Sequence, residues 1–135
     1  MISLPIASPL HRRIWIVLWC ACVGGIWWLS SMPHPPSPLQ DIEFHDKLEH
    51  ILAFFCVGMS GGIALYVNTH RTMRVVILSA VIFAVIYGFT DEVHQAFVPN
   101  RSVSVLDWFA DCCGALLAGY GLSNVLPHIR ADQRH

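Results

Sequence analysis

Four long apolar runs constrain this chain more than any other feature of its sequence. The runs cover residues 14–32, 48–67, 73–89 and 105–126, and each is close to the roughly 20 residues that a helix needs to cross a bilayer. Only 13% of the residues are charged, against roughly 25% in a typical soluble domain. We therefore predict an all-α, polytopic membrane protein, a four-transmembrane-helix bundle built as a single domain over residues 1–135.

Polar connectors separate the four runs. The first run ends at a cluster of prolines in residues 33–38, which cannot continue a helix. Residues 68–72 form a short polar turn, so we expect the second and third runs to be antiparallel neighbours. Residues 90–104 are polar and amphipathic, and we predict a short interfacial helix and a turn there. A short polar tail is expected from Pro127 onward.

The charged residues fall unequally on the two sides of such a bundle. Four spans place both termini on one side, together with Arg12, Arg13, Arg71, Arg74, Arg130 and Arg134. Lys47 and Arg101 lie on the other side, with eight of the nine acidic residues. Because basic residues are retained in the cytoplasm, we predict a multi-pass protein of the inner cell membrane with cytoplasmic N and C termini. The net charge of -1 gives no reason to expect a nucleic-acid partner.

Three segments bring ionisable and polar side chains to the predicted outer face: the start of the second run, the segment after the third, and the start of the fourth. Within the helical segments these residues are three or four positions apart, so they share one side of each helix. The candidate site residues are Asp46, Lys47, His50, Glu92, Gln95, Arg101, Asp107 and Asp111.

Asp111 is the deepest of these residues. A charged group near the bilayer centre costs about 2.5–3.5 kcal/mol, so Asp111 should face the bundle and needs a partner. Arg101, Lys47 and His50 are the candidates for that partner. Gly114 continues the same side of the helix, so we expect the acidic face to be a close-packing face as well. The alternative is that these groups only lock the helix ends together.

The sequence around these residues resembles the VanZ-like family. The resemblance rests on DKLEH at residues 46–50 and on YGFTDEVHQAFVPNRSVSVLDWFADCCG at residues 87–114. The family pattern reads D-K-x-x-H, then E-x-x-Q-x-F-x-P-x-R, then D-x-x-x-N-x-x-G. The matching positions here are Asp46, Lys47, His50, Glu92, Gln95, Phe97, Pro99, Arg101, Asp107, Asp111 and Gly114. Of these, Phe97 and Pro99 are expected to shape the turn.

Two positions depart from the family pattern. Asp111 stands where the family usually has Asn, and a protonated Asp111 would supply the hydrogen bonding of that amide. Asn100 stands where Gly is common before the arginine, and the turn stays feasible because Asn tolerates the left-handed conformation. The resemblance implies four spans and a function in the cell envelope, with glycopeptide (teicoplanin) resistance in the family's namesake. It implies no particular reaction.

Two classes of function fit these residues. In the first, an outer polar pocket binds or acts on a cell-envelope lipid or precursor, and its basic groups meet phosphate. The ligand-binding residues would be Lys47, Gln95, Arg101 and Asp111. The alternative is a membrane-embedded enzyme on a lipid-linked substrate, with Glu92 or His50 as acid–base and Arg101 as the anion stabiliser. The candidate catalytic residues are Asp46, His50, Glu92 and Asp107.

No cofactor and no metal is expected. His45, Glu49 and His50 resemble H-x-x-E-H, but the spacing is one residue too long and places the two histidines about 140° apart on a helix. A metal site shared between helices stays geometrically open, and its residues would be Asp46, His50, Glu92 and Asp107. The Gly-rich helix faces could also support a homodimer.

Overall fold

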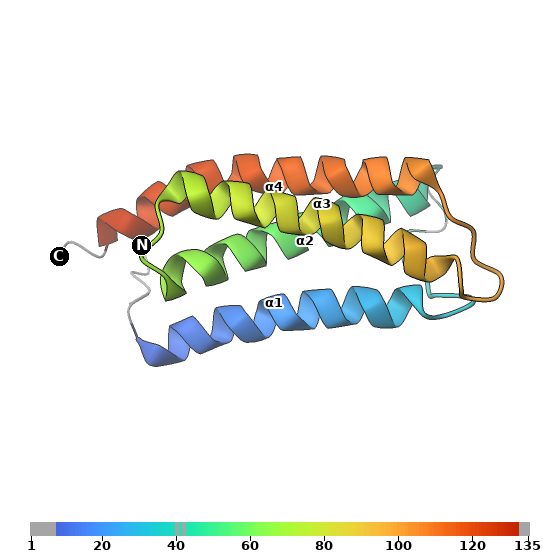
Figure 1. Ribbon diagram of the computed structural model, residues 1–135, viewed down its shortest axis with the longest axis horizontal. Helices are drawn as coiled ribbons and strands as arrows, with labels where there is room; N and C mark the ends of the chain where they lie inside the picture. The colour runs from blue at the N-terminus through green and yellow to red at the C-terminus, as the bar shows by residue number, and fades with distance from the viewer. Residues whose placement is uncertain (1–7, 40, 42, 133–135) are drawn as a thin grey trace.

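The fold consists of four helices joined by short connectors. The computed structural model describes residues 8–39, 41 and 43–132, with side chains up to residue 129. In chain order the helices are α1 (Pro9–Ser30), α2 (His45–Asn68), α3 (Met73–Gln95) and α4 (Val105–Asp132), and the described part of the chain holds no strand (Figure 1). Each helix is long and apolar enough to cross a membrane. The predicted all-α fold with four spans is confirmed.

The two ends of the bundle differ in charge. The start of α1 and the end of α4 lie at one end of the bundle (Figure 1). That end also holds the turn between α2 and α3, and it carries Arg12, Arg13, Arg71 and Arg74. The opposite end, which we call the polar end, is formed by the last turns of α1 and α3 and the first turns of α2 and α4. Arg134, predicted on the arginine-rich side, lies outside the described residues.

Helices α2 and α4 approach each other closely through small residues. A Cβ atom built on Gly58 would lie 2.6 Å from the Cβ of Ala118. A Cβ atom on Gly114 would overlap the carbonyl oxygen of Ile51, so at this point the backbones of the two helices are in contact. Any residue other than glycine at position 114 would force the two helices apart. The predicted close packing on the acidic side of α4 is confirmed.

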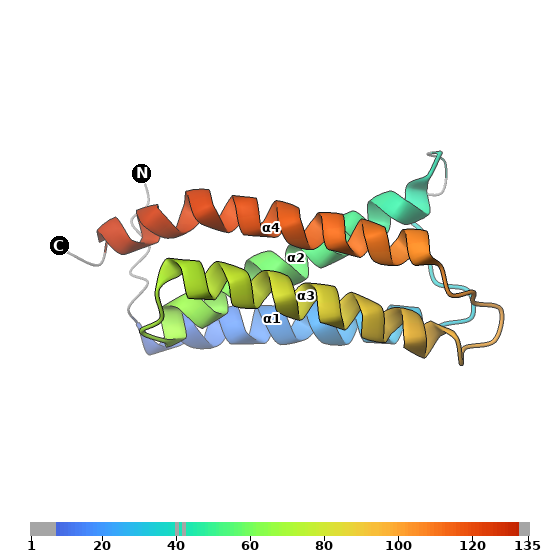
Figure 2. The same cartoon turned by 45° about the horizontal axis from the view of Figure 1, so that its top comes forward.

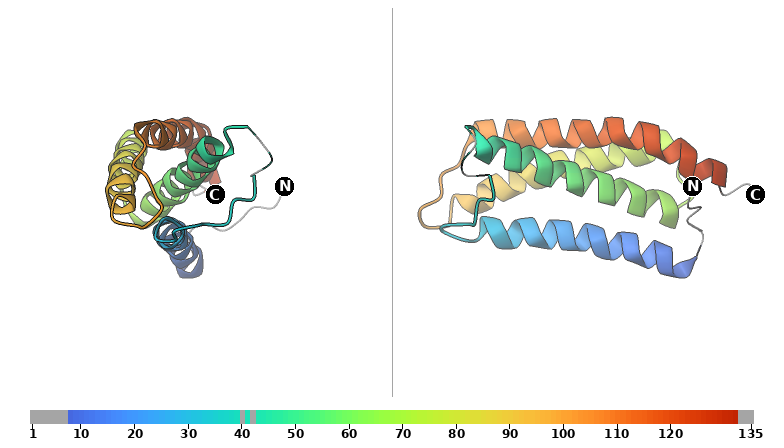
Figure 3. Two further views of the ribbon diagram at one scale, coloured as in Figure 1. Left: turned by 90° about the vertical axis from the view of Figure 1, so that its right-hand side faces the viewer. Right: turned by 180° about the vertical axis from the view of Figure 1, so that it is seen from behind.

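Helix α1 is the least buried of the four. It packs on α2 and, over fewer residues, on α3, whereas among the described residues it makes no contact with α4. The end-on view shows α1 outside the group formed by the other three helices (Figure 3), and in the turned view α3 passes in front of it (Figure 2). Its central hydrogen bond comes from the Tyr87 hydroxyl, which donates to the Val23 carbonyl at 2.7 Å.

The predicted short interfacial helix is not a separate element. α3 runs without a break to Gln95, so residues 90–95 are its last turns, and no helix is present in residues 96–104. Residues 89–95 contain neither proline nor glycine, so their polar side chains extend the helix beyond its apolar part. The predicted tail is also helical in part, because α4 continues past Pro127. The proline removes a single backbone donor, and the helix tolerates that loss near its end.

Candidate functional site

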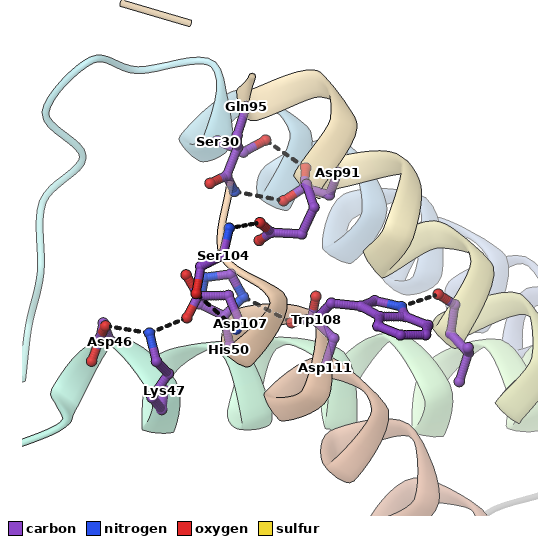
Figure 4. Close-up of polar contacts among 12 residues, drawn as sticks. Ser30, Asp46, Lys47, His50, Asp91, Gln95, Ser104, Asp107, Trp108 and Asp111 are labelled. Carbon is purple, nitrogen blue, oxygen red and sulfur yellow. Dashed lines mark hydrogen bonds and ion pairs between the residues drawn. The ribbon is translucent and has the colours of Figure 1, made fainter. Parts of the chain in front are cut away.

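His50 and Asp111 form the deepest polar contact of the polar end. The His50 Nδ1 atom lies 2.8 Å from Asp111 Oδ1, joining α2 to α4 (Figure 4). Asp111 has no exposed surface. Its partner is His50, one of the three candidates that the sequence offered. The second carboxylate oxygen of Asp111 has no hydrogen-bond partner. Gly88 of α3 faces this side chain, and a Cβ there would lie 2.8 Å from that oxygen. The three helices thus meet around one buried carboxylate.

Lys47 lies between two carboxylates. Its ammonium group donates to Asp46 Oδ2 at 2.7 Å and forms a second ion pair with Asp107 Oδ1 (Figure 4). Asp46 is more than half exposed, whereas the side chain of Asp107 is only 14% exposed. The contact to Asp107 therefore ties α2 to α4, and the charge of Lys47 is already neutralised within the protein.

Ser104 caps the start of α4 and connects it to α3. The Ser104 hydroxyl accepts a hydrogen bond from the Asp107 N–H at 3.2 Å, as an N-cap residue does. In a capping box the acidic residue three positions later accepts the N–H of the cap residue. Here the Ser104 N–H donates instead to Glu92 Oε2 at 2.8 Å. Because Glu92 takes this place, the carboxylate of Asp107 remains free to bind Lys47.

Three potential ligand groups converge at this end from three helices. A ring nitrogen of His50, a carboxylate oxygen of Glu92 and one of Asp107 all lie within 4.8 Å of one another. Glu92 is 3% exposed, and its Oε1 atom has no hydrogen-bond partner. The arrangement places two acids and an imidazole close enough to share a proton or a cation.

A second polar group ties α1 to α3. Ser30 donates to Asp91 Oδ1 at 2.6 Å, and Gln95 donates to Asp91 Oδ2 at 3.0 Å, all three side chains being buried (Figure 4). Nearby, the Ser31 hydroxyl lies 2.9 Å from His94 Nε2. The two serines and Asp91 were not among the site residues predicted from the sequence. The i, i+4 spacing of Asp91 and Gln95 was the available signal, but nothing in the sequence marked the serines.

Arg101 lies in the connector between α3 and α4. The preceding Asn100 adopts the left-handed conformation with φ 63°, as its tolerance of that region predicted. Arg101 is half-buried, its Nε atom has no hydrogen-bond partner, and no side chain in the described residues forms an ion pair with it. Phe97 is 81% exposed, so it does not shape this turn by packing.

One cavity lies away from the polar end. It measures about 430 Å³ and is bordered by α1, α2 and α3, with Trp19, Gly61 and Phe83 among its lining residues. Its lining is almost entirely apolar, and it is found in the half of the bundle away from the polar end. In a bilayer, lipid chains would fill such a space, so we do not connect it with the polar residues.

The structure brings most of the predicted residues together. His50 contacts Asp111, Lys47 contacts both Asp46 and Asp107, and Glu92 lies beside His50 and Asp107. Gln95 is turned instead toward Asp91 and the end of α1. Arg101 shares the polar end but forms no ion pair with the other described residues of the site.

The fold and the site define a class: a small multi-pass membrane protein with a polar centre at one end of an otherwise apolar bundle. Within this class the particular family can be stated. The sequence model of the VanZ/LLP1 family matches residues 11–126, which is most of the chain. The chain belongs to this family, as its resemblance indicated. Comparison with curated proteins and with solved structures gives no match.

Proposed function

We propose that the polar end binds the phosphate-bearing headgroup of a cell-envelope lipid or of a lipid-linked envelope precursor. The observation that carries the proposal is the guanidinium of Arg101, which forms no ion pair with any described residue. A half-buried guanidinium without an anionic partner leaves its donors unused, and its planar fork matches two phosphate oxygens. An anion from outside the protein would supply what the described residues do not.

The surroundings of Arg101 suit a lipid ligand. Phe97 and Val103 flank it in the connector, and both side chains are exposed. Apolar and aromatic side chains at the end of a span lie at the membrane interface, where headgroups are found. A lipid headgroup would therefore reach Arg101 without leaving the membrane.

The contacts of Lys47 favour a different role for this residue. Its charge is already matched by Asp46 and Asp107, so a phosphate would have to compete with two carboxylates. We accordingly assign the anion to Arg101, and we assign to Lys47 the joining of α2 and α4.

The proposed orientation follows from the separation of charges between the two ends. With the arginine-rich end in the cytoplasm, as the positive-inside rule favours, the polar end faces the outer side of the inner membrane. Lipid-linked precursors of the envelope are exposed there. A change in sensitivity to teicoplanin-like antibiotics would then be a consequence of binding such a precursor.

A second candidate function is catalysis on a lipid-linked substrate. It is favoured by one specific observation, the convergence of His50, Glu92 and Asp107 within 4.8 Å. In this case Glu92 or His50 would transfer a proton, and Arg101 would stabilise the anion that forms.

Binding by purified protein tests the proposal. Wild-type protein and Arg101→Gln would be titrated in detergent with a polyisoprenyl phosphate, and Arg71→Gln, the same change at the exposed opposite end, is the matched control. Loss of a charge-assisted contact of about 1.5–3 kcal/mol weakens binding about tenfold or more in Arg101→Gln alone. Equal affinity of all three proteins would refute the proposal.

The same titration, followed by thin-layer separation of the lipid, tests the catalytic alternative. Conversion of the lipid by wild-type protein but not by Glu92→Gln supports it. Unchanged lipid after prolonged incubation with folded wild-type protein would argue against an enzyme acting on this substrate.

A further inference from the structure

We propose that His50, Glu92 and Asp107 form a binding site for one divalent metal cation of the Zn²⁺ or Mn²⁺ type. The three residues come from α2, α3 and α4, and their ligand atoms lie within 4.8 Å of one another. The inference goes beyond the proposed function and does not depend on it, because metal binding is measured without any lipid.

The buried carboxylate of Glu92 is the observation that points to a cation. Glu92 is 3% exposed and lies in the last turns of a membrane span. Oε2 accepts the Ser104 N–H, whereas Oε1 has no hydrogen-bond partner in the described part of the chain. A buried carboxylate with one oxygen left unpaired is costly, and the ammonium of Lys47 is already bound by two aspartates. A cation between Glu92, His50 and Asp107 removes this cost.

The orientation of His50 is that of a metal ligand. When its Nδ1–H donates to Asp111 Oδ1 at 2.8 Å, the lone pair of Nε2 remains available. Metal-binding histidines characteristically donate their other ring N–H to a carboxylate or a carbonyl, which fixes the tautomer and the ring orientation. Asp111 would therefore be a positioning residue, and its complete burial makes it a rigid one.

The other two ligands are held in a similar way. Lys47 binds Asp107 through Oδ1, and the Ser104 N–H binds Glu92 through Oε2, so each carboxylate keeps one oxygen for a cation. One imidazole and two carboxylates suit Zn²⁺ or Mn²⁺ better than the harder Mg²⁺ and Ca²⁺, which prefer oxygen ligands alone. Three protein ligands leave coordination positions open, as in sites that bind a further ligand.

Metal binding by the full-length, tag-free protein tests the site. Purified protein in detergent would be dialysed against Zn²⁺ or Mn²⁺ and its metal content measured. We expect one equivalent in the wild type and at least about tenfold weaker binding in Glu92→Gln and His50→Ala. Asp111→Ala should weaken binding about 10- to 100-fold, since it removes only the group that positions a ligand.

Matched controls separate this site from general attraction of cations. Glu43→Gln removes an exposed carboxylate near the start of α2, and His70→Ala removes an exposed imidazole at the opposite end. Both should bind one equivalent with wild-type affinity. Absence of stoichiometric binding by folded wild-type protein, or equal binding by all variants, overturns the proposal.

A spectroscopic measurement on the wild type keeps the proposal testable if the site variants fail to fold. Pulsed electron paramagnetic resonance of the Mn²⁺-loaded protein detects a nitrogen ligand directly. A coupling typical of imidazole supports the site, and its absence at full loading overturns it.

Discussion

The imidazole of His50 lies 2.8 Å from a carboxylate oxygen of Asp111, a residue with no exposed surface. The contact joins the first turns of α2 to the first turns of α4, where the two backbones converge toward Gly114. Asp111 occupies the position at which the family pattern has Asn, so the contact also shows what that position does. When the His50 Nδ1–H is the donor, this position supplies an acceptor oxygen, and an amide offers one as well as a carboxylate does.

The first prediction follows from this equivalence. Asp111→Asn keeps the acceptor for His50 and should change the free energy of unfolding little. Asp111→Ala leaves the largely covered His50 ring nitrogen without its partner and should cost about 1–3 kcal/mol. Thermal unfolding of both variants in detergent, followed by circular dichroism at helix wavelengths, measures the difference. Equal destabilisation by Asn and Ala would mean that the charge, and not the acceptor, is what His50 needs.

The second prediction concerns the contact of α2 and α4. Gly114→Ala places a Cβ against the Ile51 carbonyl oxygen, a backbone atom that cannot rotate away. The helices must separate, and we expect a loss of about 1–3 kcal/mol or more. Gly24→Ala in α1 is the matched control, because nothing lies within 4 Å of a Cβ there. The same unfolding assay should show no loss for Gly24→Ala, and similar results for both variants would contradict the close helix contact.

The third prediction tests the cap of α4. Ser104→Ala removes the hydroxyl that accepts the Asp107 N–H and should cost about 0.5–2 kcal/mol. The backbone N–H that donates to Glu92 is retained in this variant, so its effect isolates the cap. Ser102→Ala, an exposed change two residues earlier, should leave stability unchanged. If Ser104→Ala leaves the free energy of unfolding unchanged, the hydrogen bond to Glu92 alone holds the connector.

The fourth prediction concerns orientation. A green fluorescent protein fused to the C terminus should fluoresce, whereas alkaline phosphatase fused there should be inactive, since both results require a cytoplasmic C terminus. Fusion of the phosphatase after a chain truncated within residues 96–104 should give an active enzyme, because that connector belongs to the polar end. The reverse pattern would place the polar end in the cytoplasm and exclude a ligand from the outer leaflet.

The helices and most residues of the candidate site followed from the sequence for simple physical reasons. Apolar runs of spanning length can satisfy their backbone only as helices. Once these helices are placed, the spacing of Asp107 and Asp111 puts both on one side, and the neighbouring Gly114 identifies that side as the packed one. The sequence therefore predicted that Asp111 contacts a basic residue of the polar end, with His50 among the candidates.

The remaining contacts depend on helix rotation and on connector geometry, which the sequence does not encode locally. α1 is apolar on most sides, so no periodicity indicated that Ser30 would face Asp91. The partner of Glu92 is a backbone N–H, and any residue at position 104 except proline would offer the same donor. The extension of α3 to Gln95 was missed because the polar residues after Phe89 were interpreted as the start of a separate element.

The position of α1 has a consequence for assembly in the membrane. Its polar anchors at the end of the span, Ser30 and Ser31, bind residues of α3 that are synthesised 61 and 63 positions later. Because α1 packs mainly on α2, it can associate with the second span first, but these two polar contacts form only after the third span is inserted. When the third span is inserted, the Ser30 hydroxyl is already at the end of α1, so the Asp91 carboxylate enters the membrane beside a hydrogen-bond donor.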